Sequence, residues 1–133
     1  LAREVCDGSI VGRRVTVLGG SFKPHSDDTR DSPALEVAEQ MRLQGAHVTV
    51  TDPQAIANAR NTYPDLHFVE DLNEAVGGAE LVLLLTEWPE YVALDPTELG
   101  NLVASRRMLD GRNVLDPAQW RAAGWTYRAL GRP

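Results

Sequence analysis

Residues 13–33 read RRVTVLGGSFKPHSDDTRDSP, and this stretch predicts the start of an α/β fold. Arg13 to Leu18 predicts a strand, because the apolar run is short, contains β-branched valines and ends at a pair of glycines. Ser32 and Pro33 then predict the beginning of a helix, since serine is a favoured N-cap and proline is favoured at the first helical position. The loop between them is longer than the usual connection of about two to six residues, and such long loops are typically functional.

The rest of the chain continues this alternation of strands and helices. Positions 34, 37, 38 and 41 are apolar at helical spacing after Pro33, and Gly45 is expected to end that helix. Leu81 to Leu85 is uninterrupted and apolar, which is typical of a strand buried on both faces, so we expect it to lie centrally in a sheet. Further strands are predicted at 47–51, 66–69, 113–115 and 125–129, and further helices through Ala59, after Asp71 up to Gly77, at 97–103 and at 117–123.

This order of elements predicts a Rossmann-like, doubly wound α/β fold with three layers, α/β/α. The sheet should be mostly parallel, with helices on both faces and right-handed crossovers. A chain of 133 residues suits one domain, which we expect to cover residues 1–133 and to bury roughly two thirds of its unfolded surface.

The charge and composition exclude several classes of partner. A net charge of -6 and a pI near 5.0 argue against binding to nucleic acid or to an anionic membrane surface, because both need a basic face. No stretch approaches the ~20 apolar residues of a membrane span and no secretory pattern opens the chain, so we expect a cytoplasmic protein. Leu1 in place of a methionine indicates a fragment of something longer. Cys6 is the only cysteine, which excludes an internal disulfide.

The long loop contains Lys23, the only lysine among 13 cationic residues. An ammonium group is a compact point charge suited to one phosphate or sugar oxygen. Lys23 follows a strand and precedes a helix, where α/β folds commonly bind nucleotides, so we interpret it as a ligand contact. The alternative is an ordinary solvated lysine.

Other residues of the loop and of the strand ends have structural interpretations. Asp27 and Asp28 are expected to brace the loop with Arg30. A metal is not expected, because only His25 adds a further ligand type nearby. Trp88 follows the apolar strand and can either line a cleft or pack in the core, and we favour packing.

The residues do not form an NAD-binding motif. Such a site needs Gly-x-Gly-x-x-Gly turning directly into a helix, with an acidic residue about twenty positions further on. Residues 19–22 supply only the opening glycines, and Asp52 lies too far downstream because the loop intervenes. Asp52 is better explained as a turn residue before Pro53.

Five short motifs in a fixed order resemble a known family. The chain is similar over essentially its whole length to the carboxy-terminal domain of the UDP-glucose and GDP-mannose dehydrogenase family, and the UDP-glucose 6-dehydrogenase branch looks closest. The matching motifs are Gly19-x-x-Phe22-Lys23-Pro24-x-x-Asp27-Asp28-x-Arg30-x-Ser32-Pro33, Gly45-Ala46, Asp52-Pro53, Thr86-Glu87-Trp88 and Asp110-Gly111-Arg112-Asn113.

The resemblance implies a binding site without catalytic residues or metal. It assigns Phe22 and Lys23 to a loop that contacts the UDP-sugar, and Arg112 to a contact at the mouth of the cleft. A forked guanidinium and a point-charge ammonium both suit a pyrophosphate. The alternative for Arg112 is a surface ion pair with Asp110. Ser21, Asp27, Asp28, Arg30 and Trp88 are expected to support the loop or the cleft.

The resemblance also implies a larger enzyme around this domain. Members oxidise the sugar C6 alcohol to a uronic acid in two hydride transfers to NAD, through a cysteine in a Gly-Gly-x-Cys motif. NAD binds to an amino-terminal domain, a central helical region follows, and the whole is a homodimer or larger. Residues 1–12 would be the tail of that helix and a linker. Cys6 lies outside the motif, so the fragment alone should be inactive.

Three alternatives remain open from the sequence. The domain could belong to a UDP-N-acetyl-mannosamine or GDP-mannose dehydrogenase, because residues in other domains take part in selecting base and sugar. It could instead be a stand-alone nucleotide-binding regulatory module, since fold does not dictate activity. A third role is that of a dimer contact.

Overall fold

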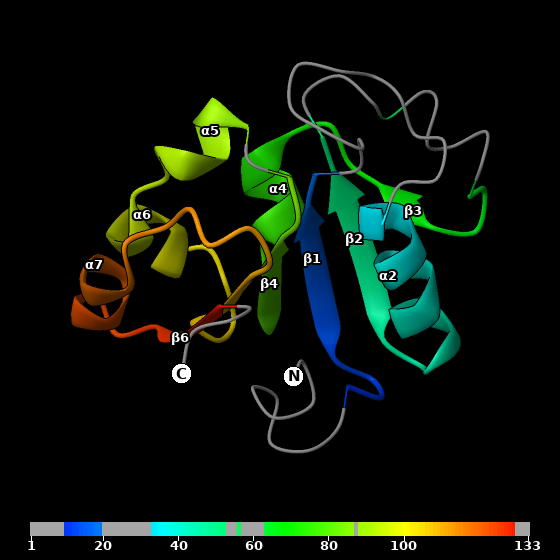
Figure 1. The fold of residues 1–133 in the computed structure, drawn as a ribbon. Helices are drawn as coiled ribbons and strands as arrows, with labels where there is room; N and C mark the ends of the chain where they lie inside the picture. Colours follow the sequence, from blue (N-terminus) through cyan, green and yellow to red (C-terminus); the bar gives the residue numbers. More distant parts are fainter. Residues whose placement is uncertain (1–9, 20–32, 53–55, 57–62, 87, 130–133) are drawn as a thin grey trace.

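The structure is a computed structural model that describes residues 10–19, 33–52, 56, 63–86 and 88–129 (Figure 1). Within this part of the chain, six strands form one sheet in the order β3-β2-β1-β4-β5-β6, and every neighbouring pair is parallel. The strands are β1 (Arg14–Leu18), β2 (His47–Thr51), β3 (His67–Phe68), β4 (Leu81–Leu84), β5 (Arg107–Asp110) and β6 (Thr126–Ala129). The helices are α2 (Pro33–Leu43), α4 (Leu72–Val76), α5 (Pro89–Val92), α6 (Pro96–Gly100) and α7 (Pro117–Ala122).

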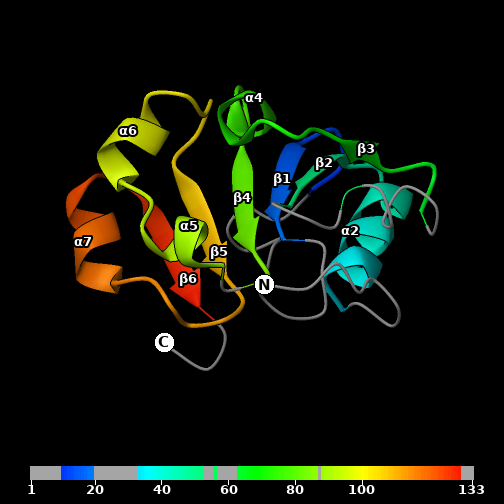
Figure 2. The same ribbon diagram turned by 90° about the horizontal axis from the view of Figure 1, so that it is seen from above.

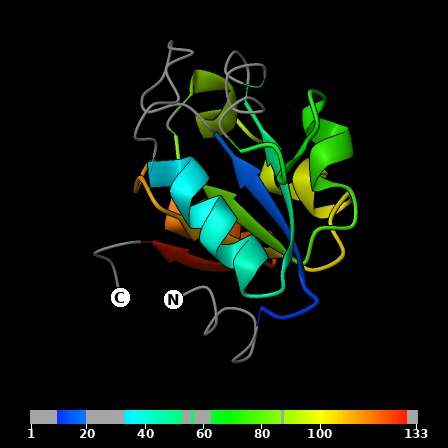
Figure 3. The same cartoon turned by 90° about the vertical axis from the view of Figure 1, so that its right-hand side faces the viewer.

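Helices cover both faces of the sheet, as the order of elements predicts. Figures 2 and 3 show α2 on one side of the strands and α4 and α6 on the other. Two hydrophobic clusters fill the two faces. One contains the inward positions of α2, and the other contains buried residues of α4, α5, α6 and α7. The three-layer, doubly wound α/β architecture is thereby confirmed.

The central strands β1 and β4 alternate between the two clusters. Val15 and Val17 of β1 lie in the cluster of α2, together with Leu81 and Leu83 of β4. Leu18 and the even-numbered residues of β4 lie in the other cluster. Because successive side chains point to opposite faces, an apolar run without alternation is what a doubly covered strand requires. The central position expected for residues 81–85 is therefore confirmed.

Aspartates begin three of the short helices. Asp71, Asp95 and Asp116 each accept a hydrogen bond from the backbone N–H two residues further on. Asp95 and Asp116 are each followed by a proline at the first helical position. The missing N–H of that proline costs no hydrogen bond, because the first N–H groups of a helix have no partner within it. None of the helices in the described residues is long and apolar enough to cross a membrane.

One predicted strand is wrong. Residues 113–115 lie instead in the loop after β5, which is the strand at this place in the order and ends at Asp110. Asn113 has φ 58°, a left-handed conformation that breaks a strand. The sequence pattern does not predict α5, and the helix expected at 97–103 is the shorter α6. The helix expected through Ala59 lies outside the described residues apart from Ile56, which is helical and buried.

Gly19, after β1, lies in close contact with Thr86, after β4, and a substitution at Gly19 tests how tight this contact is. Its φ is +103°, and a Cβ there would lie 2.5 Å from both Cβ and Oγ1 of Thr86. Gly12 has φ +74°, and a Cβ added to it would meet nothing within 4 Å, so Gly12→Ala isolates the backbone strain. We expect Gly12→Ala to cost about 1 kcal/mol and Gly19→Ala about 1 to 3 kcal/mol more, measured by urea unfolding. Equal losses would show that Thr86 moves aside freely.

Candidate functional site

The strand order defines a point where the sheet changes direction. From β1 the chain proceeds outward to β2 and β3, and it then returns to the other side of β1 to form β4, β5 and β6. In open α/β sheets, ligands bind in the crevice outside the carboxyl ends of the strands at such a point. The segments that follow β1, β2, β4 and β5 are therefore the first place to look for a site.

Backbone hydrogen bonds extend the sheet past the strand ends at this edge. The Gly19 N–H donates to Thr51 O at 2.8 Å, and the Leu85 N–H donates to Leu18 O at 3.0 Å. On the other side, the Gly111 N–H donates to Leu84 O at 2.9 Å. The loops after β1, β4 and β5 therefore start at one level, and the loop after β1 starts directly beside Thr86.

Two buried side chains tie the segment after β4 to the end of β2. The Trp88 indole Nε1–H donates to Asp52 Oδ2 at 3.2 Å, and the Tyr91 hydroxyl donates to Thr51 O at 3.3 Å. Trp88 is only 2% exposed and Asp52 only 5%. Burial raises the pKa of Tyr91 well above its ordinary value, with the negative charges of Asp52 and Glu90 adding to the effect. The phenol therefore remains a proton donor at any physiological pH.

Asp110 organises the loop after β5. Its side chain is fully buried, and its Oδ1 accepts the Arg112 N–H at 3.0 Å. Its Oδ2 accepts the N–H groups of Val114 and Leu115, both at 2.9 Å, and the Tyr127 hydroxyl at 2.7 Å. A buried carboxylate needs such donors to offset its loss of hydration. The backbone of this loop is consequently held in place by its hydrogen bonds to the Asp110 carboxylate.

Arg112 stands exposed on this loop, at the carboxyl edge of the sheet. The Asp110 carboxylate accepts a hydrogen bond from the backbone N–H of Arg112. This bond does not involve the Arg112 guanidinium, so it is distinct from the surface ion pair named as the alternative. The other sequence candidates for substrate contact or loop support lie outside the described residues: Ser21, Phe22, Lys23, Asp27, Asp28 and Arg30. Of the sequence-derived candidates, the structure thus places Arg112 at the edge and Trp88 inside the protein behind it.

Sequence reasoning missed the roles of several residues here. It considers Asp110 only as an ion-pair partner, although an aspartate followed by glycine is a recognised signal of a side chain that bonds the backbone of its own turn. Tyr127 gives no local signal, because it reaches Asp110 from the edge strand β6. In the described part of the chain, no group of three or more His, Cys, Asp or Glu residues could hold a metal ion.

Comparison with known proteins assigns this arrangement to a family. The family described as "UDP-glucose/GDP-mannose dehydrogenase family, UDP binding domain" matches residues 16–117. The chain belongs to this family. The match runs from β1 to the start of α7 and includes the described segments at the carboxyl edge of β1, β2, β4 and β5. The family and the fold inferred from the sequence are confirmed.

Relatives of this UDP-binding domain are similar over nearly all of the chain. A UDP-glucose 6-dehydrogenase of Rhizobium meliloti is 37% identical over 126 residues, which cover 95% of this chain and 29% of that protein. One from Bacillus subtilis is 35% identical, covering 95% and 28%. The chain therefore spans less than a third of the length of these relatives.

Solved structures agree with this assignment. A UDP-glucose dehydrogenase from Pyrobaculum islandicum superposes with a TM-score of 0.75 at 34% identity, covering 94% of this chain and 28% of the other. An NDP-N-acetyl-D-galactosaminuronic acid dehydrogenase from Methanosarcina mazei has a TM-score of 0.85 at 28% identity, covering 98% and 27%. In both cases the similarity is to a part of a longer chain.

The Asp110 carboxylate should contribute more to the free energy of unfolding than any one of its hydrogen-bond donors. Asp110→Asn keeps one acceptor oxygen but turns an NH2 group toward backbone N–H donors, so we expect a loss of about 2 to 4 kcal/mol in the free energy of unfolding. Tyr127→Phe removes one donor and leaves the carboxylate with its backbone partners, so it should cost about 1 kcal/mol. Urea unfolding of both variants measures this difference. Equal losses would mean that the backbone bonds contribute little.

Proposed function

We propose that this chain is the carboxy-terminal substrate domain of an NAD-dependent UDP-glucose 6-dehydrogenase and that it binds the UDP part of UDP-glucose. The observation that carries the proposal is the match of the family's UDP-binding domain to residues 16–117. Residues 1–133 would form the domain, with residues 1–12 as the tail of a preceding central helix and a linker. The reaction of the whole enzyme would oxidise UDP-glucose to UDP-glucuronate in two hydride transfers.

The relatives favour UDP-glucose over other nucleotide-sugars. Curated relatives called UDP-glucose 6-dehydrogenase reach 37% and 35% identity. The solved UDP-glucose dehydrogenase is 34% identical, whereas UDP-N-acetyl-mannosamine dehydrogenases from Pyrococcus horikoshii and Staphylococcus aureus are 26% identical. UDP-N-acetyl-mannosamine and GDP-mannose stay the alternative substrates of this proposal.

The binding residues of the proposal are Phe22, Lys23 and Arg112. The Arg112 guanidinium, supported at the carboxyl edge by the turn around Asp110, would contact the nucleotide-sugar. Lys23 would add a point charge on an oxygen, and the Phe22 ring would shield the ligand from water. Ser21, Asp27, Asp28 and Arg30 would support the loop, and Trp88 would support the edge from inside.

The domain's contribution to the reaction would be binding energy. A nucleotide held far from the reacting carbon positions the sugar C6 without taking part in the chemistry. NAD, which accepts the hydrides, would bind to the amino-terminal domain of the enzyme, and the catalytic cysteine would lie outside this chain. The described residues would thus orient the substrate, and this chain alone would be inactive. The whole enzyme would be a cytoplasmic homodimer or larger assembly of chains with amino-terminal and central domains.

Calorimetric titration of this chain with UDP, UDP-glucose, GDP and NAD at one salt concentration tests the binding proposal. We expect UDP and UDP-glucose to bind, and Arg112→Gln to weaken that binding about 10- to 100-fold, because a hydrogen bond to a charged group contributes about 1.5 to 3 kcal/mol. Arg128→Gln makes the same charge change on the edge strand β6 and should leave binding unchanged. Preferential binding of NAD would overturn the proposal.

Kinetics of the full-length enzyme test Lys23 separately. Lys23→Ala should lower kcat/KM for UDP-glucose by about 10- to 100-fold, since the charged contact is lost from both the bound substrate and the transition state. The KM for NAD should not change, because that cofactor is assigned to another domain. Unchanged kinetics with UDP-glucose would remove Lys23 from the site.

A further inference from the structure

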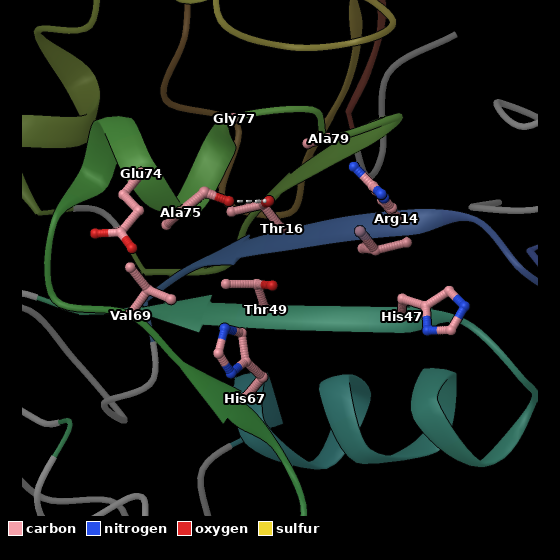
Figure 4. A pocket seen from close by; sticks show the side chains of 11 residues that line it. Arg14, Thr16, His47, Thr49, His67, Val69, Glu74, Ala75, Gly77 and Ala79 are labelled. Carbon is pink, nitrogen blue, oxygen red and sulfur yellow. Dashed lines mark hydrogen bonds between the residues drawn. The ribbon is translucent and has the colours of Figure 1, made fainter.

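A polar pocket lies in the half of the sheet that does not contain Arg112. It has a volume of about 290 Å³ and occupies the face of the sheet over β1, β2 and β3, beside α4 (Figure 4). Arg14, His47 and His67, which contribute to its lining, are the first residues of their strands. The pocket therefore lies over the half of the sheet formed by β1, β2 and β3, whereas Arg112 follows β5 in the other half.

The strand register brings the polar side chains of this pocket together. Arg14 of β1 is paired with His47 of β2, and Thr49 of β2 is paired with His67 of β3. Neighbouring strands are about 4.8 Å apart, so paired residues lie side by side. Residues 47 and 49 point to the same face because side chains alternate. One guanidinium, two imidazoles and one hydroxyl from three strands consequently line the same face, with Thr49 and His67 two residues further along the strands than Arg14 and His47.

The Arg14 side chain differs from those of Arg13 and Arg42 in its partners. Arg13 pairs with Glu80 at 2.9 Å, and Arg42 pairs with Glu39. Among the described residues, Arg14 forms no ion pair and its side chain makes no hydrogen bond. Its guanidinium lies against Gly78, where a Cβ would come within 2.9 Å of Nη1. The glycine therefore leaves room for this cation at the rim of the pocket.

The donors of this pocket suit a tetrahedral oxyanion better than a metal or a nucleic acid. A guanidinium, an imidazole N–H and a hydroxyl all donate hydrogen bonds. The described residues contain no three-ligand group for a metal, and the chain carries a net charge of -6. The Thr16 hydroxyl already donates a hydrogen bond to Ala75 O at 2.7 Å, so Thr49 is the hydroxyl that can donate to a ligand. The one carboxylate in the lining, Glu74, comes from α4.

We propose that this pocket binds a phosphate group, either as free phosphate or as part of a small phosphorylated metabolite. Arg14, His47 and His67 donate to the phosphate oxygens, and Thr49 adds a hydroxyl. Glu74 repels a second anion and accepts hydrogen bonds from hydroxyl groups, so a metabolite would direct its hydroxyls toward α4. The ligand would occupy the domain together with a nucleotide bound at Arg112, because the pocket lies over β1, β2 and β3 and Arg112 follows β5 in the other half of the sheet.

NMR titration of the chain with inorganic phosphate, at ionic strength held constant with sodium chloride, tests this proposal. We expect saturable shifts of the amide signals of Arg14, His47, Thr49 and His67, with the signals of Arg112 unchanged. Arg14→Gln should weaken binding at least about 10-fold. Arg128→Gln is the charge-matched control and should have no effect. Shifts that do not saturate, or equal weakening by both variants, would overturn the proposal.

Glycerol 3-phosphate in the same titration distinguishes the two sources of the phosphate. Tighter binding than inorganic phosphate, with the difference abolished by Glu74→Gln, identifies a hydroxylated phosphorylated metabolite. Equal affinities identify phosphate itself. If Arg14→Gln does not fold, the His47→Gln, His67→Gln double variant replaces it with the same expectation. UDP binding to each variant should persist, so a failure of the nucleotide proposal and a failure of this one remain separate results.

Discussion

The pairing of β1 with β4 is the interaction on which the rest of the structure depends. It joins the half of the sheet formed by β1, β2 and β3 to the half formed by β4, β5 and β6. All residues of β4, and all but the first of β1, are buried, so both hydrophobic clusters are built against this pair. The same pairing sets Gly19 against Thr86 and so fixes where the two halves meet at the carboxyl edge.

The carboxyl edge is built mainly from bonds to the backbone. Asp110 holds three N–H groups of its own turn, Tyr91 holds a carbonyl of β2, and Gly19 continues the ladder beyond β1. Such bonds fix the path of the chain through its main-chain groups. Arg112 is thus an exposed residue on a turn whose backbone is fixed from inside, which is the arrangement expected of a residue that meets a ligand.

Much of the fold could be predicted from local pattern. The helix after Ser32 is recognisable from its cap and its apolar spacing, β2 from its alternation before Asp52-Pro53, and β4 from its uninterrupted apolar run. β5 is not, because Arg107–Asp110 contains only two apolar residues, and its strand character comes from lying between β4 and β6. Residues 113–115 look like a strand by composition, but the carboxylate of Asp110 captures N–H groups of this segment.

The site was predictable only in part, for a similar reason. Arg112 and the loop after β1 could be named from motifs, since those motifs are local in sequence. The bond from Trp88 to Asp52 joins residues 36 positions apart, and that from Tyr127 to Asp110 spans 17, so neither leaves a local pattern. Which donors meet which acceptors at this edge is decided by the order of strands in the sheet.

The β1–β4 pairing also has a consequence for how the chain reaches its native state. Val15 pairs with Leu81, which lies 66 residues later (81 minus 15). Contacts between such distant segments form slowly, because the entropy of closing the intervening loop is lost before the contact is gained. β1, α2 and β2 can associate early as neighbours in sequence. The edge where β1 meets β4 can be completed only when β4 inserts beside β1, so the carboxyl edge is assembled by a late, non-local step of folding.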